Sequence, residues 1–310
     1  MESFNYLGYT MTCDNRDEEH VKNQVGKARA IMGKIWGIGE KLCKNDWMRR
    51  MNLFKTLVKS VLFYGVEVWG YKEWEGIERI KKIYMKWVLG LDRGTPDSIL
   101  RRETKQNKLW AEAVFRVFKY EEKLSRLECD DIRKEIYMKK VNEIGILNKY
   151  DKERKAAWEK LGLKYAEEME SGEMKNDSKW RAMERANEQV QKEDLKKIRE
   201  TRYAESLRNL MYEEWEKNEI PGYIAEGKNI SKIARFRTGN EFNGCKFWKN
   251  EWERRCRLCG EEPESAEHIF EKCKSNRRKT ECRIALKEDG SGLGFLMGVE
   301  WLRKRKIEEG

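Results

Sequence analysis

Four residues near the C-terminal end of the sequence have the types and spacing of a zinc site. The pattern is Cys-x2-Cys, then eight residues, then His-x4-Cys, and its members are Cys256, Cys259, His268 and Cys273. Zinc favours four tetrahedral sulfur and nitrogen ligands, and Cys3His is one of the sets that structural sites use. Because a hydrolytic zinc needs an open position for water, we expect one structural zinc ion here. The alternative is a set of reduced cysteines beside a surface histidine.

Basic side chains cluster around the predicted zinc ligands and along the segment before them. Lys and Arg neutralise phosphates, and aromatic faces can stack on unpaired bases. We therefore expect contacts with RNA, DNA or both from Arg235, Arg237, Arg254, Arg255, Arg257, Lys274, Arg277, Arg278 and Lys279. Two interpretations stay open for Trp248 and Trp252, because their four-residue spacing also suits packing against the zinc knuckle.

The charge of the chain favours a polyanionic partner. The 310 residues carry a net charge of +11, and the excess lies toward the two ends of the sequence. Residues 22–59 contain ten Lys or Arg against two acidic residues, and residues 228–283 contain fifteen against nine. Basic regions of this kind are typical of nucleic-acid binding, although a Lys-rich face can also serve solubility alone.

Neither membrane insertion nor secretion is indicated by the sequence. The most apolar stretch, residues 57–69, is too short to span a bilayer and is interrupted by Lys59. The first ten residues lack the basic start and apolar run of a signal peptide. We therefore expect an intracellular protein of the nucleus or cytoplasm, whose eight cysteines are reduced.

Apolar periodicity predicts a mainly α-helical fold in four parts. A short β element at residues 4–12 precedes a compact helical domain that extends to residue 127, in which Asn45 and Asp46 could cap a buried helix. Residues 128–220 are rich in Glu, Lys and Arg and predict a solvated helical connector. Pro221-Gly222 separates this connector from a basic zinc module, residues 221–280, which is followed by a basic tail, residues 281–310.

Several short motifs, in this order, resemble the C-terminal part of non-LTR retrotransposon reverse transcriptases. They are Phe4-Asn-Tyr-Leu-Gly-Tyr9, Leu62-Phe-Tyr-Gly-Val-Glu-Val-Trp69, Lys86-Trp-Val-Leu-Gly-Leu91 and Arg235-Phe-Arg-Thr-Gly-Asn240, followed by the Cys-Cys-His-Cys pattern. The resemblance implies that residues 1–127 are a thumb-like domain, joined by a charged connector to a zinc module that engages element RNA or target DNA.

The resemblance does not extend to a catalytic centre. A polymerase palm needs an aromatic-Ala-Asp-Asp loop and another upstream Asp to hold two metal ions, and these would lie before Met1. The only Asp pair, Asp130-Asp131, lies in a charged stretch without the hydrophobic setting of that loop. We therefore expect a C-terminal fragment with no catalytic residues, which by itself is not an enzyme. The alternative function is a zinc-stabilised helical scaffold for protein interaction, and the exposed helices could support self-association.

Overall fold

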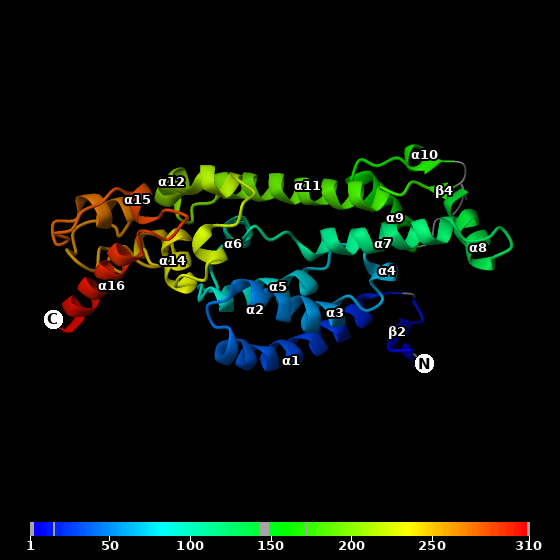
Figure 1. Cartoon of the computed structure of the whole chain (residues 1–310), viewed down its shortest axis with the longest axis horizontal. Helices are drawn as coiled ribbons and strands as arrows, with labels where there is room; N and C mark the ends of the chain where they lie inside the picture. Colours follow the sequence, from blue (N-terminus) through cyan, green and yellow to red (C-terminus); the bar gives the residue numbers. More distant parts are fainter. Residues whose placement is uncertain (1–2, 15, 143–148, 171–172, 309–310) are drawn as a thin grey trace. The chain divides into compact units, whose positions relative to one another are not determined.

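The computed structural model describes residues 3–14, 16–142, 149–170 and 173–308, which form a mainly helical protein (Figure 1). Two compact units are present, and each is assembled from three stretches of sequence. Unit 1 contains residues 1–33, 55–81 and 107–191, and unit 2 contains residues 34–54, 82–106 and 192–310. This division differs from the predicted one, because both units take helices from the region that was expected to form a single domain.

The predicted N-terminal β element is confirmed as an antiparallel hairpin. Strands β1 (Ser3–Tyr6) and β2 (Tyr9–Thr12) pair with Ser3 opposite Thr12 and Tyr6 opposite Tyr9. Leu7 and Gly8 form a two-residue loop in which both φ angles are positive. Type I′ turns have this geometry, and their twist matches that of the strands they join.

Helices follow the hairpin in the region where the apolar periodicity predicts a helical domain. The Asp46 side chain accepts a hydrogen bond from the Arg49 backbone N–H at 2.9 Å, which confirms the predicted cap of α2. Pro96 directly precedes α6, a position at which a proline costs no helical hydrogen bond. The elements of this part are α1 (Glu18–Leu42), α2 (Trp47–Leu53), the π-helical turn η1 (Phe54–Val58), α3 (Lys59–Leu62), α4 (Val66–Trp69), α5 (Glu75–Val88), α6 (Asp97–Thr104) and α7 (Leu109–Ser125).

The charged region that follows is mainly helical, but it is not a separate solvated connector. Its elements are α8 (Ile132–Asn142), α9 (Lys149–Lys160), α10 (Tyr165–Glu168), the short strands β3 (Met169–Glu170) and β4 (Glu173–Met174), α11 (Ser178–Glu200) and α12 (Glu205–Glu216). Residues 143–148 and 171–172 of the predicted connector lie outside the described residues.

Within unit 1, this region shares a buried core with α7. Trp158 of α9 stacks on Phe118 of α7 with ring centroids 4.9 Å apart. Ala182 and Ala186 of α11 belong to the same buried cluster. Small alanine side chains allow the helices to pack closely. The apolar residues that are spaced along this charged sequence therefore lie on the buried side of their helices, in the core of unit 1.

The C-terminal part of unit 2 contains short helices around an aromatic core. Phe270 lies at the centre of this core, with the rings of Phe236, Phe242 and Phe295 at centroid distances of 6.2, 5.7 and 5.2 Å. The elements are α13 (Gly222–Ala225), α14 (Ile230–Arg237), η2 (Asn243–Cys245), η3 (His268–Lys272), α15 (Cys282–Ala285) and α16 (Leu293–Glu308). Among the described residues, no helix combines the length and the apolar character needed to cross a bilayer.

Candidate metal centre

The four predicted ligands come together in unit 2. One donor atom from each of Cys256, Cys259, His268 and Cys273 lies within 4.8 Å of the others. The sulfur atoms of Cys256 and Cys273 are 3.9 Å apart, and Cys259 Sγ lies 3.2 Å from His268 Nε2. A tetrahedral zinc ion with zinc–sulfur distances of about 2.3 Å would separate two sulfur ligands by about 3.8 Å. The cluster can therefore hold one metal ion, and its size is compatible with zinc.

A tight loop brings the first two cysteines together. The Gly260 backbone N–H donates to the Cys256 carbonyl at 2.8 Å, and Gly260 has a φ of +73°, which a glycine adopts without strain. The Leu258 backbone N–H points at Cys256 Sγ over 3.4 Å. A backbone donor aimed at sulfur stabilises the thiolate form that a metal requires.

The second pair of ligands is supplied by the segment around η3. His268 Nδ1 lies 2.8 Å from a carboxylate oxygen of Glu262. With the Nδ1 proton donated to Glu262, Nε2 presents its lone pair to the cluster. Metal-binding histidines commonly have such a carboxylate partner, which fixes the tautomer and the ring orientation. The role of Glu262 could not be identified from the sequence, because it depends on how the chain folds between Cys259 and His268.

Burial affects the thiols of the cluster unequally. It raises the pKa of Cys256 to about 12 and also raises the pKa of Cys273. Burial acts in the same direction on Cys259, but hydrogen bonds from the Glu261 backbone and from His268 outweigh it and lower the pKa of that thiol to about 7. A bound cation would supply the positive charge that favours the thiolate at all three positions.

Buried ion pairs join the segment that supplies the four ligands, residues 256–279 and here called the metal-binding loop, to α16. Glu264 lies within the loop and is fully buried, and one of its carboxylate oxygens lies 2.9 Å from a guanidinium nitrogen of Arg303. Arg303 comes from α16 and is only 4 % exposed. Arg257 also donates to Glu264, with an Nε–Oε2 distance of 2.9 Å. These contacts fix the position of α16 beside the loop.

The structure places one of the predicted nucleic-acid contacts in the core. Arg237 is fully buried, and its Nε lies 2.6 Å from an oxygen of the fully buried Glu103. A second guanidinium nitrogen lies 2.6 Å from Glu214. The Glu103 carboxylate also accepts from Trp215 and Tyr223. Arg237 therefore has no free surface for a phosphate, which corrects the prediction for this residue.

Arg235 also has protein partners. Its guanidinium donates to Glu241 at 2.5 Å and to the Gly90 carbonyl at 2.6 Å. Asn240, five residues later, accepts from the backbone N–H of Asp92 at 2.6 Å. The motif at 235–240 thus binds the end of the motif at 86–91. These contacts give both motifs a structural role. Because its guanidinium already has protein partners, Arg235 is less available to bind a phosphate than the sequence indicates.

The remaining predicted contacts differ in their surroundings. Arg254 donates to the Gly244 carbonyl at 3.0 Å, and Arg255 lies over the ring of Trp252 at 4.1 Å. Arg257 is committed to Glu264, as described above. Lys274 is 82 % exposed and lies 3.5 Å from Glu261, so its ammonium group stays accessible.

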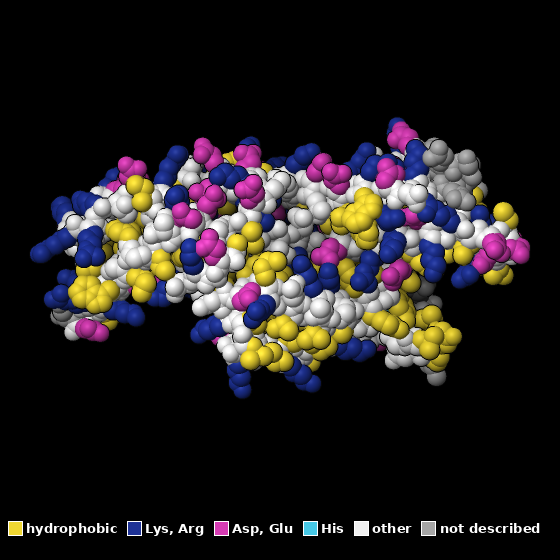
Figure 2. Space-filling view, in the orientation of Figure 1, with side chains coloured by type: hydrophobic (Ala, Val, Ile, Leu, Met, Phe, Trp, Pro, Cys, Tyr) yellow, Lys and Arg dark blue, Asp and Glu magenta, His cyan; other side chains and the backbone are white. Residues whose placement is uncertain are grey.

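Arg277, Arg278 and Lys279 are the most available of the predicted contacts. All three are exposed and directly follow the ligand segment. In the part of the chain that the structure describes, none of their side chains forms an ion pair with an acidic residue. Figure 2 shows Lys and Arg side chains gathered over the region of unit 2 that contains α15 and α16.

The two tryptophans near the metal centre do not form a core against it. Trp248 is 55 % exposed and Trp252 is 74 % exposed. The ring of Trp248 is parallel to that of Tyr203, with centroids 6.3 Å apart. Of the two open interpretations, packing against the zinc knuckle is therefore not what the structure shows, and both rings have an accessible face.

No protein-family model, no curated protein and no solved structure matches this chain. The resemblance to retrotransposon reverse transcriptases therefore stays a prediction from the motifs.

Proposed function

We propose that the chain binds nucleic acid through a basic surface built around a structural zinc ion. The observation that carries the proposal is the position of Arg277, Arg278 and Lys279, which follow the ligand Cys273 and are exposed without acidic partners among the described residues. Uncompensated cations at one site attract phosphates and release the counterions bound to them. Four protein ligands leave no open position on a tetrahedral ion, which favours a structural role for the metal.

The metal would act by holding the basic loop in shape. Cys256, Cys259, His268 and Cys273 would bind it, and Glu262 would orient the histidine. A segment of this size cannot bury enough apolar surface to fold alone, so metal binding supplies part of its folding free energy. The motif resemblance supports the same proposal: a non-catalytic part of a reverse-transcriptase-like protein that engages RNA or DNA.

The test combines metal content with salt-dependent binding. We expect one zinc per chain by elemental analysis, and binding to RNA or DNA whose affinity falls steeply as salt rises. Cys256→Ser should lose the metal and the binding together. Cys129→Ser is the matched control, because Cys129 is exposed and lies outside the cluster. An affinity for nucleic acid that does not change with salt concentration, or that stays the same after the metal is lost, would contradict the proposal.

A further inference from the structure

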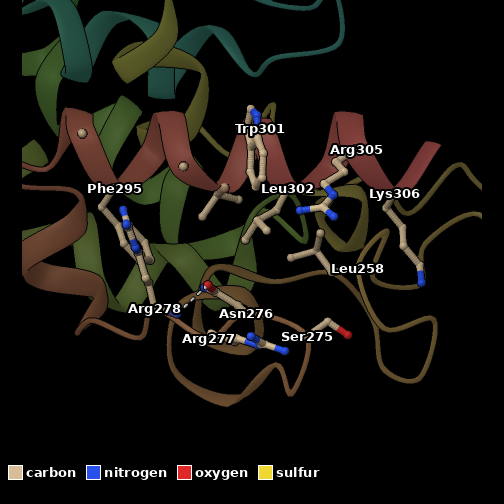
Figure 3. A pocket seen from close by; sticks show the side chains of 13 residues that line it. Leu258, Ser275, Asn276, Arg277, Arg278, Phe295, Trp301, Leu302, Arg305 and Lys306 are labelled. Carbon is tan, nitrogen blue, oxygen red and sulfur yellow. Dashed lines mark hydrogen bonds between the residues drawn. The ribbon is translucent and has the colours of Figure 1, made fainter. Parts of the chain in front are cut away.

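A groove lies between α16 and the metal-binding loop within unit 2 (Figure 3). Its volume is about 790 Å³. Figure 3 shows Leu302, Arg305 and Lys306 extending from α16 on the side of the loop that contains Asn276 and Arg277. Sequence reasoning identified the basic end of this helix but did not place it opposite the metal-binding loop.

The groove joins an apolar floor to positively charged walls. Leu258, Phe295 and Leu302 contribute apolar side chains, and the cations are Arg277, Arg278, Arg305 and Lys306. All of the residues that line the groove are described, and none of them is acidic. Among the described residues, no ion pair joins Arg277, Arg278 or Lys306 to an acidic side chain, and cations of this kind around an apolar surface suit a ligand that is both anionic and flat-faced.

The groove is held open by contacts that do not use these cations. The buried pair of Arg303 with Glu264 anchors α16 to the loop. Asn276 donates from its side chain to the Ile269 carbonyl at 2.8 Å and fixes the loop wall. On the helix, Gly294 and Gly298 lie along the groove, and a Cβ built on either would meet no atom within 4 Å. The backbone of α16 is therefore open to close approach by a ligand.

We propose that this groove binds an unpaired stretch of a polynucleotide, with phosphates on the cations and base faces on the apolar floor. The inference rests on the proposed function and specifies its ligand. A duplex presents phosphates at its surface but keeps its bases stacked inside, so it could not use a recessed apolar floor. An unpaired strand presents both phosphates and accessible base faces along its length.

A steric block at Gly298 tests the groove without removing a charge. Gly298→Leu would project into the open space, and it should leave the fold intact because leucine favours helix more than glycine. We expect affinity for an oligouridine to fall about tenfold or more, the scale associated with the loss of base stacking. Gly33→Leu is the matched control, because Gly33 is an exposed glycine of α1 with nothing near its Cβ position.

Charge variants test the walls of the groove. Arg277→Gln and Lys306→Gln should each weaken binding and reduce the salt dependence, by about 0.7 in the slope of log affinity against log salt per lost contact. Lys304→Gln is the control, because Lys304 is exposed on the same helix but does not line the groove. Folding of each variant is checked by circular dichroism and metal content.

The outcomes separate the groove from the wider proposal. Preference for oligouridine or oligothymidine over a duplex of equal length, lost in Gly298→Leu and retained in Gly33→Leu, supports the groove. Equal binding by Gly298→Leu and the unaltered chain overturns the groove but leaves nucleic-acid binding in place. Preference for the duplex also overturns the groove. No salt-sensitive binding to any of these probes overturns both proposals.

Discussion

Glu262 is not one of the four metal ligands, but it forms a hydrogen bond with the ligand His268. Through this bond a single side chain can change the affinity of the cluster for the ion. Its carboxylate holds His268 Nδ1 at 2.8 Å, although the side chain itself is 62 % exposed. Partners of this kind affect metal affinity because they set the direction of the ligand lone pair.

We expect Glu262→Gln to weaken metal binding by about 10- to 100-fold, because an amide orients the imidazole less strongly than a carboxylate does. Competition with a metal chelator measures the change. Glu261→Gln is a suitable control, because Glu261 contacts only the exposed Lys274 by ion pairing among the described residues. Equal affinities for the two variants would rule out an orienting role for Glu262.

The ligands could be identified from sequence, but their supporting residues could not. The spacing of the four ligands can be read directly from the sequence, at Cys256, Cys259, His268 and Cys273. Glu262 and Glu264 lie in the same loop, and nothing in their type shows that one supports a ligand while the other is buried between Arg257 and Arg303. The same limit applies to Arg237, which looks like any other basic residue of the segment until Glu103 is placed beside it.

At the level of elements, Arg237 connects four helices of unit 2. It lies on α14, Glu103 on α6, Glu214 and Trp215 on α12, and Tyr223 on α13. Each contact satisfies a buried polar group that would otherwise be costly. Arg237 and its partners therefore have a structural role.

Arg237→Met should lower the free energy of unfolding by about 3–5 kcal/mol, because it leaves the Glu103 carboxylate buried without its cation. Urea unfolding followed by circular dichroism measures the loss. Arg283→Met is the control, because Arg283 is exposed on α15 and its replacement should change stability by no more than about 0.5 kcal/mol. A folded Arg237→Met chain of unchanged stability that fails to bind nucleic acid would instead support direct contact.

The hairpin of unit 1 is attached to the helices through His20. The Thr10 backbone N–H donates to Nδ1 at 3.2 Å, and Nε2 lies 3.0 Å from the Tyr64 carbonyl. Both bonds are made by the neutral ring with its proton on Nε2. The ring also stacks on Tyr9 at 3.9 Å. This contact joins two of the motifs, at 4–9 and 62–69. Gly65 of the second motif has a φ of +68°, and a Cβ at this position would also clash with the Tyr9 ring, so both the backbone conformation and the close contact require a glycine.

Unit 1 should lose stability in mild acid through His20. Burial lowers the pKa of this imidazole, although the Tyr64 carbonyl and Asp17 oppose the shift and Lys27 adds to it. The unfolded chain therefore takes up a proton first, so the stability contributed by neutral His20 is complete above about pH 6.5 and is lost as the pH falls below that value. Urea midpoints between pH 8 and 5 measure the trend. His20→Gln should flatten it, and an unchanged pH dependence in that variant would assign the effect to other groups.

At the level of the whole molecule, the sequence was more informative about elements than about their grouping. The mainly helical fold, the Asp46 cap and the N-terminal β element follow local rules, and the structure confirms them. The predicted domain borders followed changes in composition, whereas the units follow packing. Trp158, Ala182 and Ala186 lie in a charged sequence, yet they belong to the core of unit 1.

Removal of the metal should therefore have a local effect. We expect a chelator to increase hydrogen exchange across residues 245–280 and in the contacts to α16, while α7 and its core in unit 1 remain protected. Hydrogen exchange read by mass spectrometry distinguishes this from uniform loss of protection, which would contradict two units of separate stability.

The scaffold alternative makes its own prediction about association. Ile38, Leu42 and Met48 are exposed by 44, 76 and 53 %, so unit 2 has apolar side chains available for a protein partner. Self-association of a scaffold would grow with concentration and survive high salt, because burial of apolar surface is not screened. Light scattering at low and high salt measures it. A monomer at both salt concentrations would leave nucleic-acid binding as the better supported role.

Leu258 belongs to the metal-binding loop and also to the apolar floor of the groove, and this shared position has a thermodynamic consequence. If the bound metal shapes the floor, it raises the affinity of the groove for its ligand by some factor. Reciprocity then requires the ligand to raise the affinity for the metal by the same factor. A chain with its groove filled would therefore need a higher concentration of chelator to lose its ion at equilibrium, so occupancy of one site could be followed by observing the other.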